Sequence, residues 1–118
     1  MKPAPFDYLR PGSLTEAGAA LAEEPNAKVL AGGQSLVPLL SMRLAAPSLL
    51  VDINGLPDLS GIEVADAGVR IGALARHAEV LASAEVRRVQ PLVSLALSHV
   101  AHATIRNRGT TVGSIVHA

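Results

Sequence analysis

Two short stretches combine glycine with small polar side chains, and both could bind an anion. The first, Gly32-Gly33-Gln34-Ser35, follows the apolar end of a predicted strand at residues 28–31. Glycine leaves the backbone amides accessible, and the first amides of a following helix favour negative charge. A diphosphate is therefore the predicted occupant, with Ser35 adding a hydroxyl donor. A plain strand-to-helix turn would use the same residues, so both interpretations stay open.

The second stretch, Gly109-Thr110-Thr111-Val112-Gly113-Ser114, offers the same chemistry. Arg106 and Arg108 precede it, either to balance an anion or as a solvated flank of a helix end. Neither stretch is the G-x-G-x-x-G of a dinucleotide-binding fold or the G-K-[ST] of a nucleoside triphosphatase. Two such loops predict one shared anionic ligand.

Alternating strands and helices are expected to position the first loop. Ser13 and Glu16 form a predicted capping box at the start of a helix that Pro25 ends. Ser35 is a predicted N-cap, and Pro38 fits the first helical turn. Asp52, at a strand end, is predicted to cap a turn rather than to act as a catalyst. Strands are predicted at residues 6–9, 28–31 and 49–53, and helices at residues 14–24 and 36–44.

The second half changes pattern after the turn dipeptides at residues 54–58. We predict a hairpin of residues 62–64 and 69–71 and a helix at residues 76–83. His77 lies at the start of this helix, where we expect it to have a structural role and not to bind a ligand. A further helix is predicted from Pro91 to about Ala103, followed by a loop that enters a strand at the end of the sequence. The boundary divides the chain into residues 1–55 and 56–118. The predicted buried stripe of the Pro91 helix is Leu92, Leu95, Ala96, His99 and Val100.

The amino-acid composition argues against several classes of function. The 118 residues are 49% hydrophobic and 17% charged, with a net charge of zero, which is typical of a globular protein and argues against a nucleic-acid surface. The absence of cysteine excludes disulfides, thiolate zinc sites and iron–sulfur ligation within the chain. No stretch has the apolar core of a signal peptide or the length of a membrane span, so a cytoplasmic protein is the default expectation. The strand-like ending without a polar cap predicts a fragment of a longer domain.

Several stretches in one register resemble the FAD-binding subunit of molybdenum hydroxylases. The residues that carry the resemblance are 28–38 (KVLAGGQSLVP), 42–44 (MRL), Pro47, 50–53 (LVDI), 71–77 (IGALARH) and 105–110 (IRNRGT). This family includes the flavoproteins of xanthine dehydrogenase and aerobic carbon monoxide dehydrogenase. The resemblance implies an α+β fold of the PCMH type, like that of vanillyl-alcohol oxidase, with two small α/β lobes of which the second is incomplete here.

The resemblance also implies the cofactor, FAD, and the residues that contact it. The first family loop lies against the FAD pyrophosphate mainly through backbone amides, and the second loop, G-T-[IV]-G-G-[SN], also holds FAD. The implied cofactor-binding residues are Ala31, Gly32, Gly33, Gln34, Ser35, Leu36, Thr110, Thr111, Gly113 and Ser114. Val112 stands where the family has the first glycine of a pair, and a β-branched residue would be strained there if the position required φ > 0.

The implied function is electron transfer within a dehydrogenase complex. A molybdenum-cofactor large subunit and an iron–sulfur small subunit are the implied partners, with FAD passing electrons to an external acceptor. No catalytic residue and no metal ligand is predicted in this chain. The competing hypothesis is a truncated, non-catalytic remnant or subunit-assembly module that no longer holds FAD.

Overall fold

In the computed structural model, which describes residues 1–118, the chain divides into two units, Met1–Pro57 and Asp58–Ala118. The first unit contains a parallel β-sheet, and the second unit joins a β-hairpin to several short helices. The protein is thus α+β, as the sequence predicts. The assignment of residues 1–55 and 56–118 to two lobes of one cofactor-binding domain stays a prediction.

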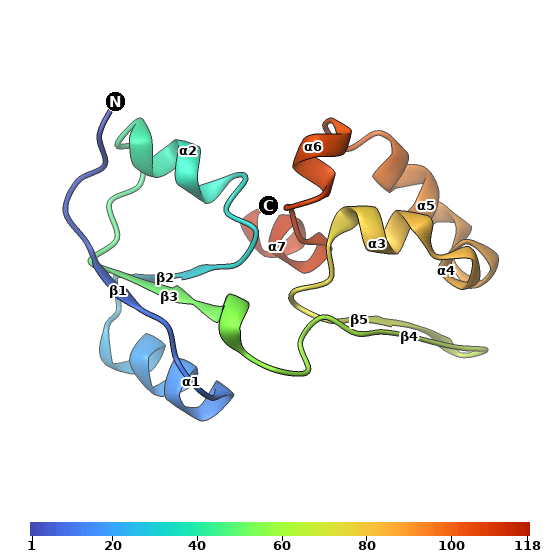
Figure 1. Cartoon of the computed structure of the whole chain (residues 1–118), viewed down its shortest axis with the longest axis horizontal. Coiled ribbons are helices and arrows are strands. Elements are labelled where there is room, and N and C mark those ends of the chain that lie inside the picture. The colour runs from blue at the N-terminus through green and yellow to red at the C-terminus, as the bar shows by residue number, and fades with distance from the viewer. The chain divides into compact units, whose positions relative to one another are not determined.

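A three-stranded parallel sheet forms the centre of the first unit. Its elements are β1 (Asp7–Leu9), α1 (Leu14–Glu23), β2 (Ala27–Leu30), α2 (Leu36–Ser41), β3 (Leu49–Asp52) and the 3₁₀ turn η1 (Ile53–Gly55). The strand order is β1-β3-β2, so fully buried Val51 pairs with Leu9 on one side and Val29 on the other. Parallel strands need crossover connections, and Figure 1 shows α1 below the strands and α2 above them. The first loop therefore leaves the carboxyl end of β2 and enters α2.

The helix ends of the first unit follow some of the predicted signals and depart from others. Ser13 Oγ accepts a hydrogen bond from the Glu16 amide (3.1 Å), as expected for an N-cap. The Glu16 carboxylate accepts from the amide of Gly12 (2.8 Å) instead of closing the predicted reciprocal pair with Ser13. Helix α2 ends before residue 44 because Arg43 adopts a left-handed φ of 56°, which directs the Leu44 amide back to the carbonyl of Leu39 (2.9 Å).

The second unit packs short helices against an antiparallel hairpin. Its elements are β4 (Ile62–Ala65), β5 (Gly68–Ile71), α3 (His77–Ala82), α4 (Ala84–Val89), α5 (Pro91–Ser98), α6 (Ala103–Arg106) and α7 (Thr111–His117). The two-residue connection between the strands, Asp66 and Ala67, lies where the hairpin was predicted to turn, but Gly68, which was predicted to be part of the turn, already belongs to β5. Apolar side chains of the hairpin, including Ile62 and Ile71, pack against a core that contains Val80 and Val86, neither of which is accessible to solvent. This core fixes α3, whose first residue contacts the second loop.

The predicted buried stripe of α5 is wrong. Leu92 is 72% exposed and Leu95 is 59% exposed, whereas Leu97 and Ser94 are buried. The segment PLVSLALS is apolar on most of its circumference, so helical spacing alone fits more than one face. The helix also ends at Ser98, well before the predicted end, and residues 103–106 form the separate helix α6.

The predicted strand at the end of the sequence is also wrong, because residues 111–117 form helix α7. Four of these seven residues are β-branched, which favours a strand by local propensity. The helix forms because Thr110 caps it, with Thr110 Oγ1 accepting a hydrogen bond from the Gly113 amide (3.1 Å). The unpaired strand edge that was expected at these residues is therefore absent.

Candidate functional site

Hydrogen bonds hold three successive backbone carbonyls of the first loop in place. The carbonyl of Ala31 accepts from Asn54 Nδ2 (2.8 Å), that of Gly32 from Gln34 Nε2 (3.3 Å), and that of Gly33 from the Val37 amide (3.0 Å). A trans peptide directs its N–H opposite to its C=O. The amides of Gly32, Gly33 and Gln34 therefore point away from these contacts, and none of them has a hydrogen-bond acceptor in the protein. Three backbone donors in a row are available to a ligand.

Gly33 is the glycine of the pair that the backbone requires. Its φ is +74°, a left-handed value that side chains disfavour. A Cβ at this position would also lie 3.2 Å from Val37 Cγ2 and 3.4 Å from Leu30 Cδ1. Ser35 occupies the N-cap position of α2, but its side chain makes no capping hydrogen bond, so the predicted cap is only positional. The exposed Ser35 hydroxyl is available as a further donor.

A buried carboxylate lies directly behind the first loop. Asp52 is 7% exposed, and it accepts hydrogen bonds from the Tyr8 hydroxyl, from the Asn54 amide (2.9 Å) and from Asn54 Nδ2 (2.7 Å). Burial alone raises the pKa of Asp52, but the bonds from Tyr8 and Asn54, with the charge of Arg10, outweigh it and lower the pKa below its ordinary value. Asp52 thus caps the turn η1 as predicted and stays ionised.

The hydroxyl groups of the second loop face the protein. Thr110 and Thr111 are both buried: Thr110 Oγ1 caps α7, and Thr111 Oγ1 lies 3.1 Å from His77 Nδ1. A Cβ at Gly113 would lie 2.4 Å from Thr110 Oγ1, so the absence of a side chain there permits the cap. The side chains of the two threonines are therefore committed to structure, and a ligand at this loop would meet mainly backbone and Ser114.

His77 is the side chain around which the second loop is organised. Its ring is buried and contacts Thr111 Oγ1 through Nδ1 and Ser114 Oγ through Nε2 (2.9 Å), while its amide donates to the carbonyl of Gly109 (2.9 Å). A Cβ at Gly109 would lie 3.0 Å from the ring, so this glycine makes room for the imidazole. Burial, followed by the charge of Arg106, lowers the pKa of His77. The ring is therefore held neutral.

The two arginines before the second loop have different surroundings. Arg106 Nη1 donates to the carbonyls of Val100 (2.9 Å) and Ala101 (3.3 Å), and so closes the turn that follows α5. The side chain of Arg108 is exposed, and its carbonyl accepts from Arg76 Nη1 (2.6 Å). Of the two cations, Arg108 is the one whose side chain remains in solvent.

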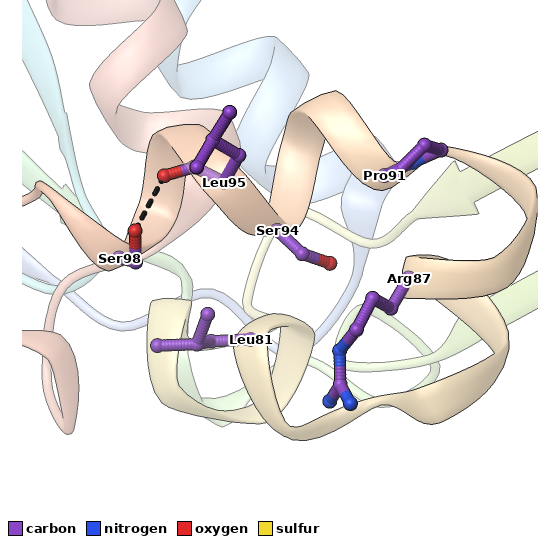
Figure 2. Close-up of a pocket in the computed structure, with 6 residues that line it drawn as sticks. All are labelled: Leu81, Arg87, Pro91, Ser94, Leu95 and Ser98. Carbon is purple, nitrogen blue, oxygen red and sulfur yellow. Dashed lines mark hydrogen bonds between the residues drawn. The ribbon is translucent and has the colours of Figure 1, made fainter.

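A separate shallow recess lies on α3, α4 and α5. Figure 2 shows its lining, which consists of Leu81, Arg87, Pro91, Ser94, Leu95 and Ser98. The Ser98 hydroxyl donates to the carbonyl of Leu95 (2.6 Å), and the buried Ser94 hydroxyl has no hydrogen-bond partner. None of the predicted site residues lines this recess, and most of its surface is apolar. No three His, Asp or Glu side chains gather to hold a metal ion.

The family described as the FAD binding domain in molybdopterin dehydrogenase matches residues 4–118. The chain belongs to this family. Subunit alpha of the 6-hydroxypseudooxynicotine dehydrogenase complex of Paenarthrobacter nicotinovorans is 49% identical over 119 residues, which cover 100% of this chain and 40% of that protein. The carbon monoxide dehydrogenase medium chain of Hydrogenophaga pseudoflava is 41% identical and covers 99% of this chain and 41% of that protein.

Solved structures of this family have the same fold. Carbon monoxide dehydrogenase from Hydrogenophaga pseudoflava superposes with a TM-score of 0.92 at 41% identity, and quinoline 2-oxidoreductase from Pseudomonas putida 86 with 0.92 at 42%. The match covers 99–100% of this chain and 41% of each of those chains. The predicted family, FAD-binding fold class and cofactor are confirmed, and this chain spans about two fifths of the length of these relatives. None of its helices combines the length and apolar character that crossing a membrane requires.

The predicted site residues of this FAD-binding domain lie in two segments of the chain, one in each unit. Residues 31–36 run from the end of β2 into α2, and residues 110–114 run from the cap into α7. Sequence reasoning missed the role of Asn54 and took His77 only as the start of a helix. An Asx residue two positions after a buried strand is a recognisable turn signal, but its contact with Ala31 spans 23 positions and has no local signature.

Proposed function

We propose that this chain binds the diphosphate of FAD through the backbone amides of its first loop. The observation that supports this most directly is the row of amides at Gly32, Gly33 and Gln34, which have no acceptor in the protein while the preceding carbonyls are all held. Successive backbone amides that have no acceptor in the protein are suitable donors to phosphate oxygens. At Gly33 no side chain intervenes, so the backbone can approach the ligand closely.

The second loop contributes to the same cofactor in this proposal. Its Ser114 hydroxyl and the exposed side chain of Arg108, nearby in the sequence, are the groups proposed to contact FAD, because the amides of Gly113 and Ser114 already donate to Thr110 (both 3.1 Å). Thr110 and Thr111 act indirectly, since their hydroxyls fix the shape of the loop. Leu36 is half-buried at the first position of α2 and is proposed to bound the first loop on its apolar side.

The chain's own contribution is binding and orientation. When bound, FAD supplies the redox chemistry by accepting electrons and passing them to an external acceptor. Asp52 and His77 are both buried in structural hydrogen bonds, so we propose a chemical role for neither. A longer protein would act as the flavin subunit of a molybdenum hydroxylase-type dehydrogenase, beside a molybdenum-cofactor subunit and an iron–sulfur subunit. A cytoplasmic location is part of the same proposal.

The names of the relatives support an assembly of this kind. They include a subunit of a dehydrogenase complex and medium chains of carbon monoxide and glyceraldehyde dehydrogenases. These 118 residues contain no cysteine, so thiolate ligands of an iron–sulfur cluster would have to lie outside them.

Titration with FAD tests the proposal. We expect the flavin spectrum to change on binding and the chain to be stabilised by about 2.7 kcal/mol when FAD is present at about 100 times its Kd. ADP, which carries the diphosphate, should compete with FAD, whereas riboflavin, which has no phosphate, should compete poorly. No spectral change and no stabilisation by FAD would refute binding by this chain.

The competing function, an assembly module without flavin, was suggested in part by Val112. Val112 was expected to be strained if its position required φ > 0, but it lies in the first turn of α7 and its φ is not positive. Valine is therefore compatible with the backbone of the second loop. A chain that fails to bind FAD yet binds partner subunits of the complex would favour this alternative.

A further inference from the structure

We propose that Asn54 is a positioning residue for FAD binding, which fixes the first loop so that the Gly32 amide faces the diphosphate. This inference rests on the proposed function and concerns a residue outside both glycine loops. The contact that carries it is the hydrogen bond from Asn54 Nδ2 to the carbonyl of Ala31 (2.8 Å). Asn54 acts through the loop and is assigned no contact with the cofactor.

The carbonyl of Ala31 lies just past the end of the β2–β3 ladder and has no backbone partner in the sheet. Strand β2 ends at Leu30, which pairs with Asp52, the last residue of β3. The chain then turns into η1, so β3 offers no further residue to pair with Ala31. The side chain of Asn54, which is in η1, takes the place of that missing partner and extends the ordered hydrogen bonding by one peptide.

The hydrogen bond to the carbonyl of Ala31 also determines the direction of the Gly32 amide. The peptide that joins Ala31 to Gly32 is planar and trans, so its N–H is directed opposite to the carbonyl that Asn54 holds. Glycine residues rotate more freely than others, and a glycine pair without such a contact would populate several orientations. Asn54 therefore removes, before the ligand arrives, part of the ordering cost of binding.

Asn54 is itself held rigidly. Both hydrogens of Nδ2 are used, one toward Ala31 and one toward Asp52 Oδ1 (2.7 Å), and the Asn54 amide donates to the same carboxylate oxygen (2.9 Å). The other carboxylate oxygen of Asp52 accepts from the Tyr8 hydroxyl. The buried carboxylate of Asp52 thus orients the side-chain amide of Asn54, which in turn fixes the carbonyl of Ala31 in the first loop.

Three variants and one control test this role. Asn54→Ala removes the side chain, and Asn54→Asp keeps its size but removes the donor to Ala31 and places a second carboxylate beside that of Asp52. Asn26→Ala is the matched control, because Asn26 Nδ2 also donates to an alanine carbonyl, that of Ala46 (3.2 Å), in the same unit but away from the loop. Tyr8→Phe loosens only the support of Asp52.

FAD affinity is the first measurement. We expect Asn54→Ala and Asn54→Asp to raise the Kd for FAD about tenfold, which corresponds to losing one hydrogen-bonding group of about 1.4 kcal/mol. Tyr8→Phe should raise it less, and Asn26→Ala should leave it unchanged although it also removes a hydrogen bond. An unchanged Kd in both Asn54 variants, or an equal change in Asn26→Ala, would overturn the inference.

Amide NMR without ligand is the second measurement, and it separates this inference from the proposed function. In Asn54→Ala the backbone signals of Gly32 and Gly33 should shift and show faster local motion, while those of Gly109 and Gly113 stay unchanged. Unchanged order at Gly32 and Gly33 would overturn the positioning role whatever the affinity. Failure of the unaltered chain to bind FAD would overturn the proposed function, and the amide signals would still decide for or against Asn54.

Discussion

The buried imidazole of His77 makes a prediction about pH that can be followed quantitatively. Its pKa is lowered in the folded chain by burial and by Arg106, whereas in the unfolded chain it returns to its ordinary value of about 6.5. Below that value the unfolded chain therefore binds a proton that the folded chain does not. The contribution of His77 to the free energy of unfolding is fully present above pH 6.5. It decreases as the pH drops from 6.5 to the lowered pKa, and below that pKa it no longer changes with pH.

The size of the effect follows from one proton. Stability should fall by no more than about 1.4 kcal/mol per pH unit within this window, since a single group contributes at most that slope. Protonation of the ring turns its accepting nitrogen into a second donor, so the Thr111 or Ser114 hydroxyl that donated to this nitrogen must reorient and accept from it instead. Loss of order should therefore begin at the second loop.

The matched variant is His77→Gln, which keeps a donor and an acceptor but cannot titrate. It should lose about 1 kcal/mol at pH 8 through poorer hydrogen bonding, and it should show a flatter dependence of stability on pH between pH 5 and 6.5. Urea unfolding at several pH values measures both effects, and NMR titration of the His77 ring measures its pKa directly. A ring that titrates at or above pH 6.5, or an identical pH dependence in His77→Gln, would refute the reasoning.

Three glycine-related predictions concern the backbone. Gly33→Ala should cost about 1–2 kcal/mol because alanine is strained at the left-handed φ of this position, and it should also weaken FAD binding; circular dichroism melting and FAD titration check this. Gly72→Ala should cost about 2 kcal/mol or more, since its Cβ would lie 2.3 Å from the carbonyl oxygen of Leu59 and two backbone hydrogen bonds there would break; urea unfolding checks it. Val112→Gly should lower stability by about 1 kcal/mol and give no gain in FAD affinity, because residue 112 is helical; tighter FAD binding by Val112→Gly would contradict this.

Local sequence signals predicted most of the elements correctly. The β-α-β-α-β order of the first unit, the hairpin turn and the capping role of Ser13 all follow from apolar spacing and from short polar signatures. Two predictions failed where local signals conflict. Residues 111–117 have strand propensity but a helix cap at Thr110, and α5 is apolar on several faces, so only the tertiary packing decides.

The two loops could be located from the sequence, but what holds them could not. Each loop is fixed by a polar side chain far away in the chain: Asn54 reaches back 23 positions to Ala31, and His77 reaches forward 34 positions to Thr111. Such pairings depend on the sheet register in the first unit and on the start of α3 in the second, neither of which leaves a short pattern. The glycines also serve different purposes, since Gly33 provides a left-handed turn whereas Gly109 makes space for an imidazole. Each glycine loop of this chain is therefore held by a side chain distant in sequence, and a substitution at Asn54 or His77 should alter the backbone of its loop although the loop sequence is unchanged.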